Sequence, residues 1–396
     1  MNQSYELPLT NEEIEAIGEY AGLTHAKINF LADLDYNKQQ QLKKDNWIVE
    51  MKTEELEKNI QRFVNIYSAI YKAGKRTARK GLYKATNKEQ IEEIKRKGEM
   101  ASFTSTSFEE DDVKTKYFGG YQDDAVILRI NVEENVPTLY IDPYKNGAGE
   151  DEEEVLISPF TKVKHISKRE NGKEEYAYYD VTLEKEELEE VPESELRALQ
   201  AQLIEGYDYY KEQVKISMEL ENRIQYLYGQ LQTDEGREVQ KLKETDLNEA
   251  VKQYSHTIKT VQEYQQQFKR MMRGLCKEKE LEIDKQREEV RIQKIEERKI
   301  RDEEHLNQLE AEIATFKQQN RNGKTNIVDM LEQYIGEMEE ISKKYRTIAE
   351  DLKVDYSQDI HFKVLEMIQN IKTTLETTEE TNESQQPSQE ENEDYK

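Results

Sequence analysis

The feature of this sequence that most constrains its folding is the distribution of proline. Five of the six prolines lie at or before Pro192, and the sixth, Pro387, lies near the end of the chain. The long stretch between these two residues contains no proline and is rich in Glu, Lys, Gln and Arg, which favour helices that proline would interrupt. The sequence therefore predicts a change near residue 190 from a mixed fold to a helical region.

The chain is long and strongly acidic, which limits the classes of partner that it can bind. Its 396 residues suggest two or three domains, and its formal net charge is -26 at pH 7. This charge opposes sequence-independent binding to nucleic acid or to anionic lipid, because phosphate contacts need clustered cations. With 35% hydrophobic and 36% charged residues, the composition indicates a modest core joined to long, solvated helices.

The sequence also lacks several familiar signals. A single cysteine, Cys276, cannot form an intramolecular disulfide, and its place on a helix flank indicates an idle thiol. No Cys/His cluster has zinc-ligand spacing, so we expect no metal. We find no membrane-spanning run and no basic-then-apolar start typical of a secretory signal. We therefore expect synthesis in the cytoplasm; secretion or delivery would use a route without a conventional signal peptide.

Residues 1–190 are predicted to form an α+β domain. Thr10, followed by acidic residues, is typical of a helix N-terminus, and Gly74 and Gly98 are typical helix ends. Beyond residue 80 the apolar period shortens towards two, between Gly, Pro, Asn and Asp residues. A helical lobe followed by short strands favours α+β. The expected strands are 81–85, 103–108, 125–132, 138–141, 154–158 and 176–183.

Residues 193–378 are predicted to form a helical coiled-coil domain. Apolar residues follow a 3,4 spacing from Val251 to Leu275, from Leu306 to Phe316 and from Met338 to Leu352. A turn-like segment at 319–324 leaves two possibilities open, an intramolecular hairpin or a homo-oligomer. Residues 379–396 are acidic and polar without an apolar period, so we expect a disordered tail.

Two short motifs place chemically useful side chains on predicted strands. Side chains two apart on a strand share a face, so Ser105 and Ser107 point the same way, as do Glu152 and Glu154. Taken alone, each motif has an ordinary explanation, namely strand hydroxyls and a solvated acidic turn. Their order in the sequence, with Glu154 running directly into an apolar triplet, favours a common site.

In this order the motifs resemble those of the ADP-ribosyltransferase exoenzyme family, the mono-ADP-ribosyltransferases that include the enzymatic subunits of clostridial binary toxins. Ser105-Thr106-Ser107 resembles the Ser-Thr-Ser motif of the family, and Glu152 to Leu156 resembles its Glu-x-Glu motif. Tyr20 and Ile28 to Leu31 resemble a stretch of its helical lobe. The resemblance covers residues 10–167. It implies a mono-ADP-ribosyltransferase fold, with an N-terminal helical lobe and two small, mostly antiparallel sheets around a cleft.

The resemblance implies cleavage of NAD at the bond between nicotinamide and ribose, followed by transfer of ADP-ribose to a target protein. By this resemblance Glu154 stabilises the positive charge that develops on the ribose, Ser105 holds Glu154, and Glu152 activates the acceptor. In the family, Glu at the position of Glu152 goes with an arginine acceptor. The implied contacts with NAD, which is a substrate here, are made by Tyr83, Lys84, Ser105, Thr106 and Ser107.

One position departs from the family pattern. Where the family has an aromatic residue followed by Arg, this chain has Tyr83 followed by Lys84. Lysine keeps the positive charge but lacks the planar fork with which arginine grips phosphate. Arg79, five residues earlier, is the alternative phosphate ligand. Arg129, inside an apolar strand, is expected to have a structural role.

Three functions therefore stay open on the sequence alone. The first is an arginine-directed mono-ADP-ribosyltransferase, like a toxin or effector, whose helical region binds a partner or forms oligomers. The second is a catalytically impaired binding or structural protein that acts through its coiled coil. The third is an NAD glycohydrolase that releases ADP-ribose to water. Tyr144, on the loop that meets the target protein in the family, is either a partner contact or an ordinary exposed aromatic.

Overall fold

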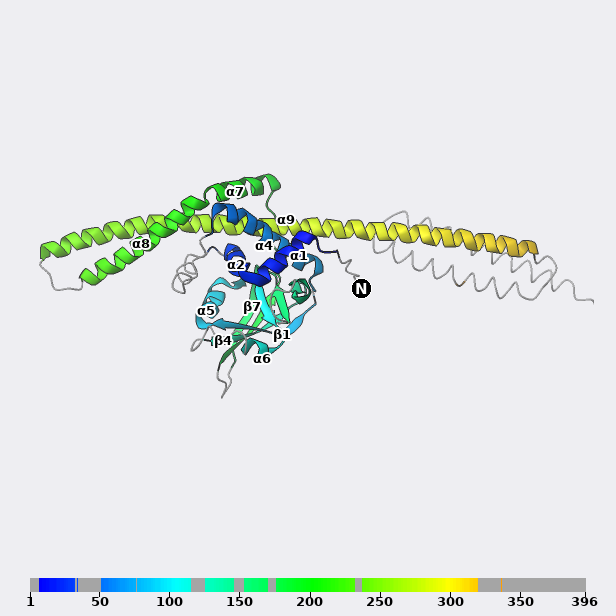
Figure 1. Ribbon diagram of the computed structural model, residues 1–396, viewed down its shortest axis with the longest axis horizontal. Helices are drawn as coiled ribbons and strands as arrows, with labels where there is room; N and C mark the ends of the chain where they lie inside the picture. Colours follow the sequence, from blue (N-terminus) through cyan, green and yellow to red (C-terminus); the bar gives the residue numbers. More distant parts are fainter. Residues whose placement is uncertain are drawn as a thin grey trace, which may run out of the picture. The chain divides into compact units, whose positions relative to one another are not determined.

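The computed structural model describes residues 7–32, 34, 51–75, 77–114, 125–145, 153–169, 176–231, 237–319 and 336. The chain divides into two compact units, residues 1–288 and 289–396. The first unit contains the predicted α+β region and most of the long helix α9 (Figure 1). In the second unit, the described residues are the end of this helix and residue 336. The rest of the predicted coiled coil and the predicted tail lie outside the described residues.

The first unit begins with a group of helices, of which the first starts and the last ends where the sequence predicts. The backbone N–H of Glu13 donates to the Thr10 hydroxyl at 3.3 Å, and the Glu13 carboxylate accepts from the Thr10 N–H at 2.8 Å. This reciprocal pair satisfies two donors that the helix itself leaves unpaired. Gly74 follows the last residue of the fourth helix, as predicted. The helices are α1 (Asn11–Glu19), η1 (Tyr20–Thr24), α2 (His25–Ala32) and α4 (Thr53–Ala73).

The described strands form one eight-stranded sheet with the order β2-β7-β8-β4-β1-β3-β6-β5. All neighbouring pairs are antiparallel except β4 and β8. A short helix, α5 (Lys88–Lys97), ends at Gly98, whose φ of 66° suits glycine. The strands are β1 (Arg79–Asn87), β2 (Glu99–Met100), β3 (Thr104–Ser107), β4 (Ala125–Val132), β5 (Thr138–Tyr140), β6 (Glu154–Ile157), β7 (Thr161–Lys168) and β8 (Ala177–Glu184).

The sheet has two parts that meet at a single residue pair. Strands β1 and β3 are paired only at Tyr83 and Ser107. On one side lie five strands of mixed direction, and on the other lie the three antiparallel strands β3, β6 and β5. The prediction of two separate sheets is therefore wrong as stated, because this pair joins them into one. We call Tyr83–Ser107 the junction pair.

Two strands were not predicted from the sequence. Strand β7 contains Lys162, Lys164 and Lys168, so its apolar alternation is weak. Pairing with β8 along most of its length holds it in the sheet. Strand β2 has only two residues and is held by β7. Both owe their conformation to a neighbouring strand rather than to their own pattern.

One apolar core lies between the two parts of the sheet. Val155 and Ile157 come from the three-stranded part, and Val126, Leu128 and Ile130 come from the five-stranded part. All five are fully buried. Since alternate residues of a strand face opposite ways, Glu154 and Leu156 lie on the other face of β6.

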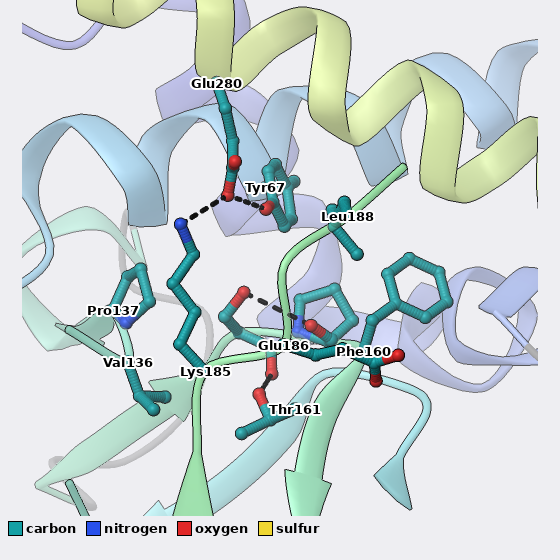
Figure 2. A pocket seen from close by; sticks show the side chains of 11 residues that line it. Tyr67, Val136, Pro137, Phe160, Thr161, Lys185, Glu186, Leu188 and Glu280 are labelled. Carbon is teal, nitrogen blue, oxygen red and sulfur yellow. Dashed lines mark hydrogen bonds and ion pairs between the residues drawn. The ribbon is translucent and has the colours of Figure 1, made fainter. Parts of the chain in front are cut away.

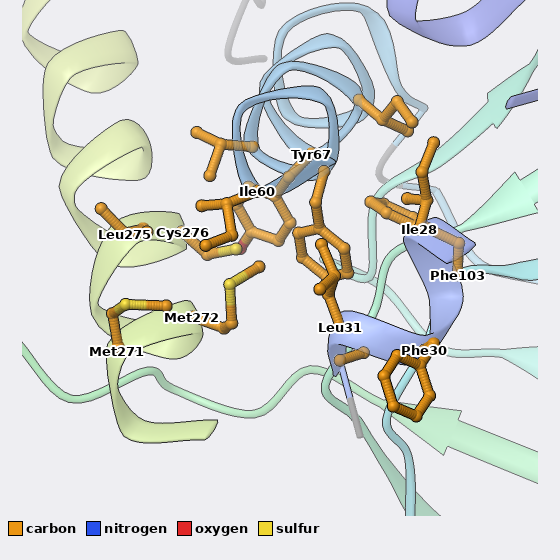
Figure 3. Close-up of a cluster of buried hydrophobic side chains, with 14 of the residues drawn as sticks. Ile28, Phe30, Leu31, Ile60, Tyr67, Phe103, Met271, Met272, Leu275 and Cys276 are labelled. Atoms are coloured by element: carbon orange, nitrogen blue, oxygen red, sulfur yellow. The ribbon is translucent and has the colours of Figure 1, made fainter. Parts of the chain in front are cut away.

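A second core joins the helices to α9. Met271, Met272, Leu275 and Cys276 of α9 are buried against α4, with Ile60 and Tyr67 facing them (Figure 3). The apolar seam predicted for a coiled coil is therefore used here, between residues 261 and 275, to pack on the N-terminal helices. The remaining helices are α7 (Glu193–Glu205), α8 (Tyr207–Leu231) and α9 (Arg237–Gln319).

Polar contacts flank the apolar contact of α9. Buried Glu280 accepts from the Tyr67 hydroxyl at 2.8 Å and is paired with Lys185 at 3.4 Å (Figure 2). A small hollow lies beside these groups, between α4, α9 and the sheet, and none of the predicted site residues lines it. Arg273 of α9 is paired with Glu99 of the sheet. Residues of α7, α8 and α9 thus share one apolar core with the helices of residues 7–73. The domain boundary predicted at 190–193 stays a prediction.

No helix in the described parts of the chain is both long and apolar enough to cross a membrane.

Candidate active site

Three of the predicted site residues lie together where β1, β3 and β6 run side by side. The Ser105 hydroxyl donates to Oε1 of Glu154, with 2.5 Å between the oxygens. The Lys84 ammonium donates to the backbone carbonyl of Ser105 at 3.3 Å. The chain thus brings residues separated by 21 and 49 positions into one hydrogen-bonded group.

The register of β3 and β6 explains this arrangement. Ser107 lies directly opposite Glu154, and Ser105 lies opposite Leu156. Ser105 and Glu154 are therefore diagonal neighbours on one face of the antiparallel pair, within reach of each other's side chains. Strand β6 begins at Glu154, as predicted from the apolar residues Val155 to Ile157 that follow it.

The second oxygen of Glu154 meets a residue that the sequence did not single out. Lys145 lies 2.9 Å from Oε2 of Glu154 and 2.8 Å from Oδ1 of Asp142. Asp142 Oδ1 also accepts the backbone N–H of Glu154 at 3.3 Å. Only the i,i+3 spacing of Asp142 and Lys145 could have suggested their ion pair. Nothing in the sequence indicated that Lys145 reaches Glu154.

The residue of the helical lobe that senses this group is Tyr20. The Tyr20 ring contacts Phe103 edge-on, with 5.7 Å between ring centroids, and its hydroxyl accepts from the Asn29 side chain at 3.1 Å. Burial raises the pKa of Tyr20 well above its ordinary value, and the nearby negative charge of Glu154 adds to this effect. Tyr20 is therefore neutral at physiological pH, and Tyr20 and Asn29 are both residues of the family-like stretch.

The other residues of the Ser-Thr-Ser motif have structural partners. The Thr106 hydroxyl donates to the Val155 carbonyl at 2.8 Å, within the ladder between β3 and β6. The Ser107 hydroxyl accepts from the backbone N–H of Glu109 at 3.1 Å. Tyr83 is opposite Ser107 and packs on a small apolar cluster around Tyr178. Roles for these residues in binding NAD stay predictions.

Glu152 lies outside the described residues, so its predicted position beside Glu154 stays a prediction. Its neighbour Glu153 has a φ of 48°, in the left-handed region. The rule that side chains two apart share a face holds only for extended residues, and β6 begins at Glu154. The argument from strand alternation therefore does not reach Glu152.

Arg79, Arg129 and Tyr144 flank the site in different ways. The Arg79 guanidinium lies 5.5 Å from the centroid of the Phe108 ring, directly after the Ser-Thr-Ser motif. Arg129 of β4 is paired with Tyr83 of β1, and the Nε of Arg129 is buried without a hydrogen bond. Tyr144 is half-buried against the core of the helical lobe, so it is not an ordinary exposed aromatic.

The geometry gives Glu154 a fixed carboxylate. One oxygen accepts from a hydroxyl, the other accepts from an ammonium group, and the side chain is only 10% exposed. A carboxylate held in this way can stabilise a positive charge that develops beside it, because it needs no reorganisation when the charge appears. Among the described residues, no group of three or more His, Cys, Asp or Glu side chains is placed to hold a metal ion.

Neither the protein-family models nor the curated proteins compared with the chain give a match. Solved structures of bacterial ADP-ribosyltransferase toxins do match, over slightly less than half of the chain. Plx2a from Paenibacillus larvae is 18% identical and matches over 45% of this chain and 88% of its own, with a TM-score of 0.29. The C3 exoenzyme of Clostridium limosum is 17% identical over 46% and 90%, with a TM-score of 0.31. C3stau2 from S. aureus, solved with NAD, is 13% identical over 45% and 88%, with a TM-score of 0.29. The function proposed below is therefore based on the contacts within the site.

Proposed function

We propose that this chain is a mono-ADP-ribosyltransferase that cleaves NAD between nicotinamide and ribose and transfers ADP-ribose to an arginine of a target protein. The observation that carries the proposal is the hydrogen bond from Ser105 to Glu154, with Lys84 on the carbonyl of the same serine. These are the residues of three separate motifs, and they meet at one place.

In this proposal Glu154 supplies the electrostatic part of catalysis. As nicotinamide leaves, positive charge develops on the ribose, and a fixed carboxylate beside it lowers the barrier. The hydrogen bond from Ser105 sets the orientation of that carboxylate. Lys84 supplies positive charge for the phosphates of NAD, and it can do so as a point charge only.

The arginine acceptor is the less direct part of the proposal. It depends on Glu152, which the family resemblance makes the residue that activates the acceptor. We therefore expect Glu152→Gln to suppress transfer to arginine while sparing hydrolysis of NAD. If both activities fell equally, Glu152 would have no special role toward the acceptor.

The proposal is tested by incubating the full chain with NAD labelled in its adenosine part, with and without a protein lysate. Nicotinamide release measures NAD cleavage, and label on protein measures transfer. We expect Glu154→Gln to lower both by about a hundredfold or more. Glu153→Gln is the matched control, because it removes the same charge from an exposed neighbouring residue. Equal activity of Glu154→Gln and wild type would refute the proposed role of Glu154.

A second candidate, a binding protein with an impaired transferase domain, is favoured by one observation. Lys84 stands where the family has arginine, and its ammonium is engaged by the Ser105 carbonyl. If wild type cleaves no NAD whereas Lys84→Arg does, this candidate is supported. Free nicotinamide without protein-bound label, from wild type in the presence of a lysate, would instead indicate an NAD glycohydrolase.

A further inference from the structure

Lys145 is one of the most buried cations among the described residues, and it lies against the proposed catalytic carboxylate. It is 5% exposed, and its ammonium lies between Asp142 at 2.8 Å and Glu154 at 2.9 Å. Burial alone would lower the pKa of Lys145, but the hydrogen bonds and charges of Asp142 and Glu154 outweigh burial and raise the pKa. Lys145 is therefore positively charged at physiological pH.

The contact also connects two points of the chain that are close to the site. Lys145 follows the short helix η5 (Asp142–Tyr144), and Glu154 is the first residue of β6. Asp142 adds a second connection by accepting the backbone N–H of Glu154. The start of β6 is thus fixed to η5 by a charged side chain and by a backbone hydrogen bond.

The charges around Glu154 show why the cation matters. Asp142 of η5 accepts the backbone N–H of Glu154, and Ser105 of β3 donates to its carboxylate. Tyr20 of the helical lobe is near enough for the charge of Glu154 to raise its pKa, and Lys84 donates to the Ser105 carbonyl. Lys145 places a positive charge between the carboxylates of Asp142 and Glu154, and removing it would leave the two negative groups close together. Two such carboxylates repel each other, which favours protonation of one and displaces the other.

We propose that Lys145 is a positioning residue, which holds the carboxylate of Glu154 in its charged form and in the orientation that the reaction needs. Ser105 fixes one carboxylate oxygen, and Lys145 fixes the other. Asp142 balances the charge of Lys145, so the group of three keeps one net negative charge to face the substrate. The part of this inference that concerns catalysis rests on the proposed function.

The first test is the pH dependence of nicotinamide release by the full chain. For Lys145→Met we expect kcat to fall about tenfold or more, with KM for NAD changed by less than about twofold. The acidic limb of the pH–rate profile should move to higher pH by about one unit. Lys145→Arg keeps the cation and should bring this limb back. The matched control is Lys162→Met, which removes an exposed lysine that also pairs with a glutamate, at 2.9 Å.

The second test needs no activity. Urea unfolding of wild type, Lys145→Met, Glu154→Gln and the double variant gives the coupling between the two side chains. We expect a coupling of about fivefold or more in the equilibrium constant for unfolding. A wild type that cleaves no NAD would defeat the proposed function, and the coupling would still decide whether Lys145 holds Glu154. Additive effects in this cycle, or an unchanged acidic limb in an active Lys145→Met variant, would overturn the inference.

Discussion

The packing of α9 against α4 makes a prediction that separates a structural helix from an independent coiled coil. Leu275 and Leu281 lie on the same helix, but Leu275 is 5% exposed within the core, whereas Leu281 is 42% exposed. Replacing the buried leucine by alanine should cost about 2–5 kcal/mol, the usual range for a leucine removed from a core. Replacing the half-exposed leucine should cost less than about 1 kcal/mol.

The assay is hydrogen exchange of peptides from α4, measured together with the urea midpoint. Because about 1.4 kcal/mol corresponds to a tenfold change in equilibrium, amides of α4 that exchange by global unfolding should exchange roughly thirtyfold to a few thousandfold faster in Leu275→Ala. Leu281→Ala should resemble wild type. Equal protection of α4 in the two variants would show that α9 contributes nothing to the stability of the N-terminal core.

Two further predictions concern stability. Burial, together with the hydrogen bond to Glu110, raises the pKa of Tyr178 to about 12, above its ordinary value of 10. The neutral form is therefore favoured in the folded state, so its contribution is complete below about pH 10 and is lost as the pH rises towards 12. Urea midpoints between pH 9 and 12 should fall less steeply in Tyr178→Phe than in wild type, and parallel curves would contradict this. Gly98 has room for a side chain, but its φ of 66° is disfavoured for any residue with a Cβ, so Gly98→Ala should cost about 1 kcal/mol. Gly229, inside α8 with open space around it, should instead tolerate alanine or gain up to about 1 kcal/mol, and equal urea midpoints for the two variants would argue against the left-handed turn at Gly98.

The sequence predicted those features that depend on local chemistry. The helix start at Thr10, and the helix ends at Gly74 and Gly98, follow from residue types alone. Most strands were found because their apolar residues alternate. Strand β7 was missed because its lysines hide that alternation, and its pairing with β8 is a long-range effect.

The partner of an apolar face was harder to predict than the face itself. The spacing of Met272 and Leu275 indicates one buried stripe, but a stripe of this kind packs equally well on a second copy or on another helix of the same chain. The structure shows it packed on α4. Lys145 was missed for a similar reason, since its meeting with Glu154 depends on how η5 and β6 are placed.

The junction pair has a mechanical consequence. Strands β1 and β4 are held by seven residue pairs and β3 and β6 by four, but β1 and β3 are held by one. A change in the angle between the two parts of the sheet therefore breaks only this one backbone pair, and its main cost is the repacking of the apolar core that the two parts share. The hydrogen bond from Lys84 to the Ser105 carbonyl joins β1 to β3 beside this single pair, so such a change would alter the distance between Lys84 and Glu154 while each part of the sheet keeps its own pairing.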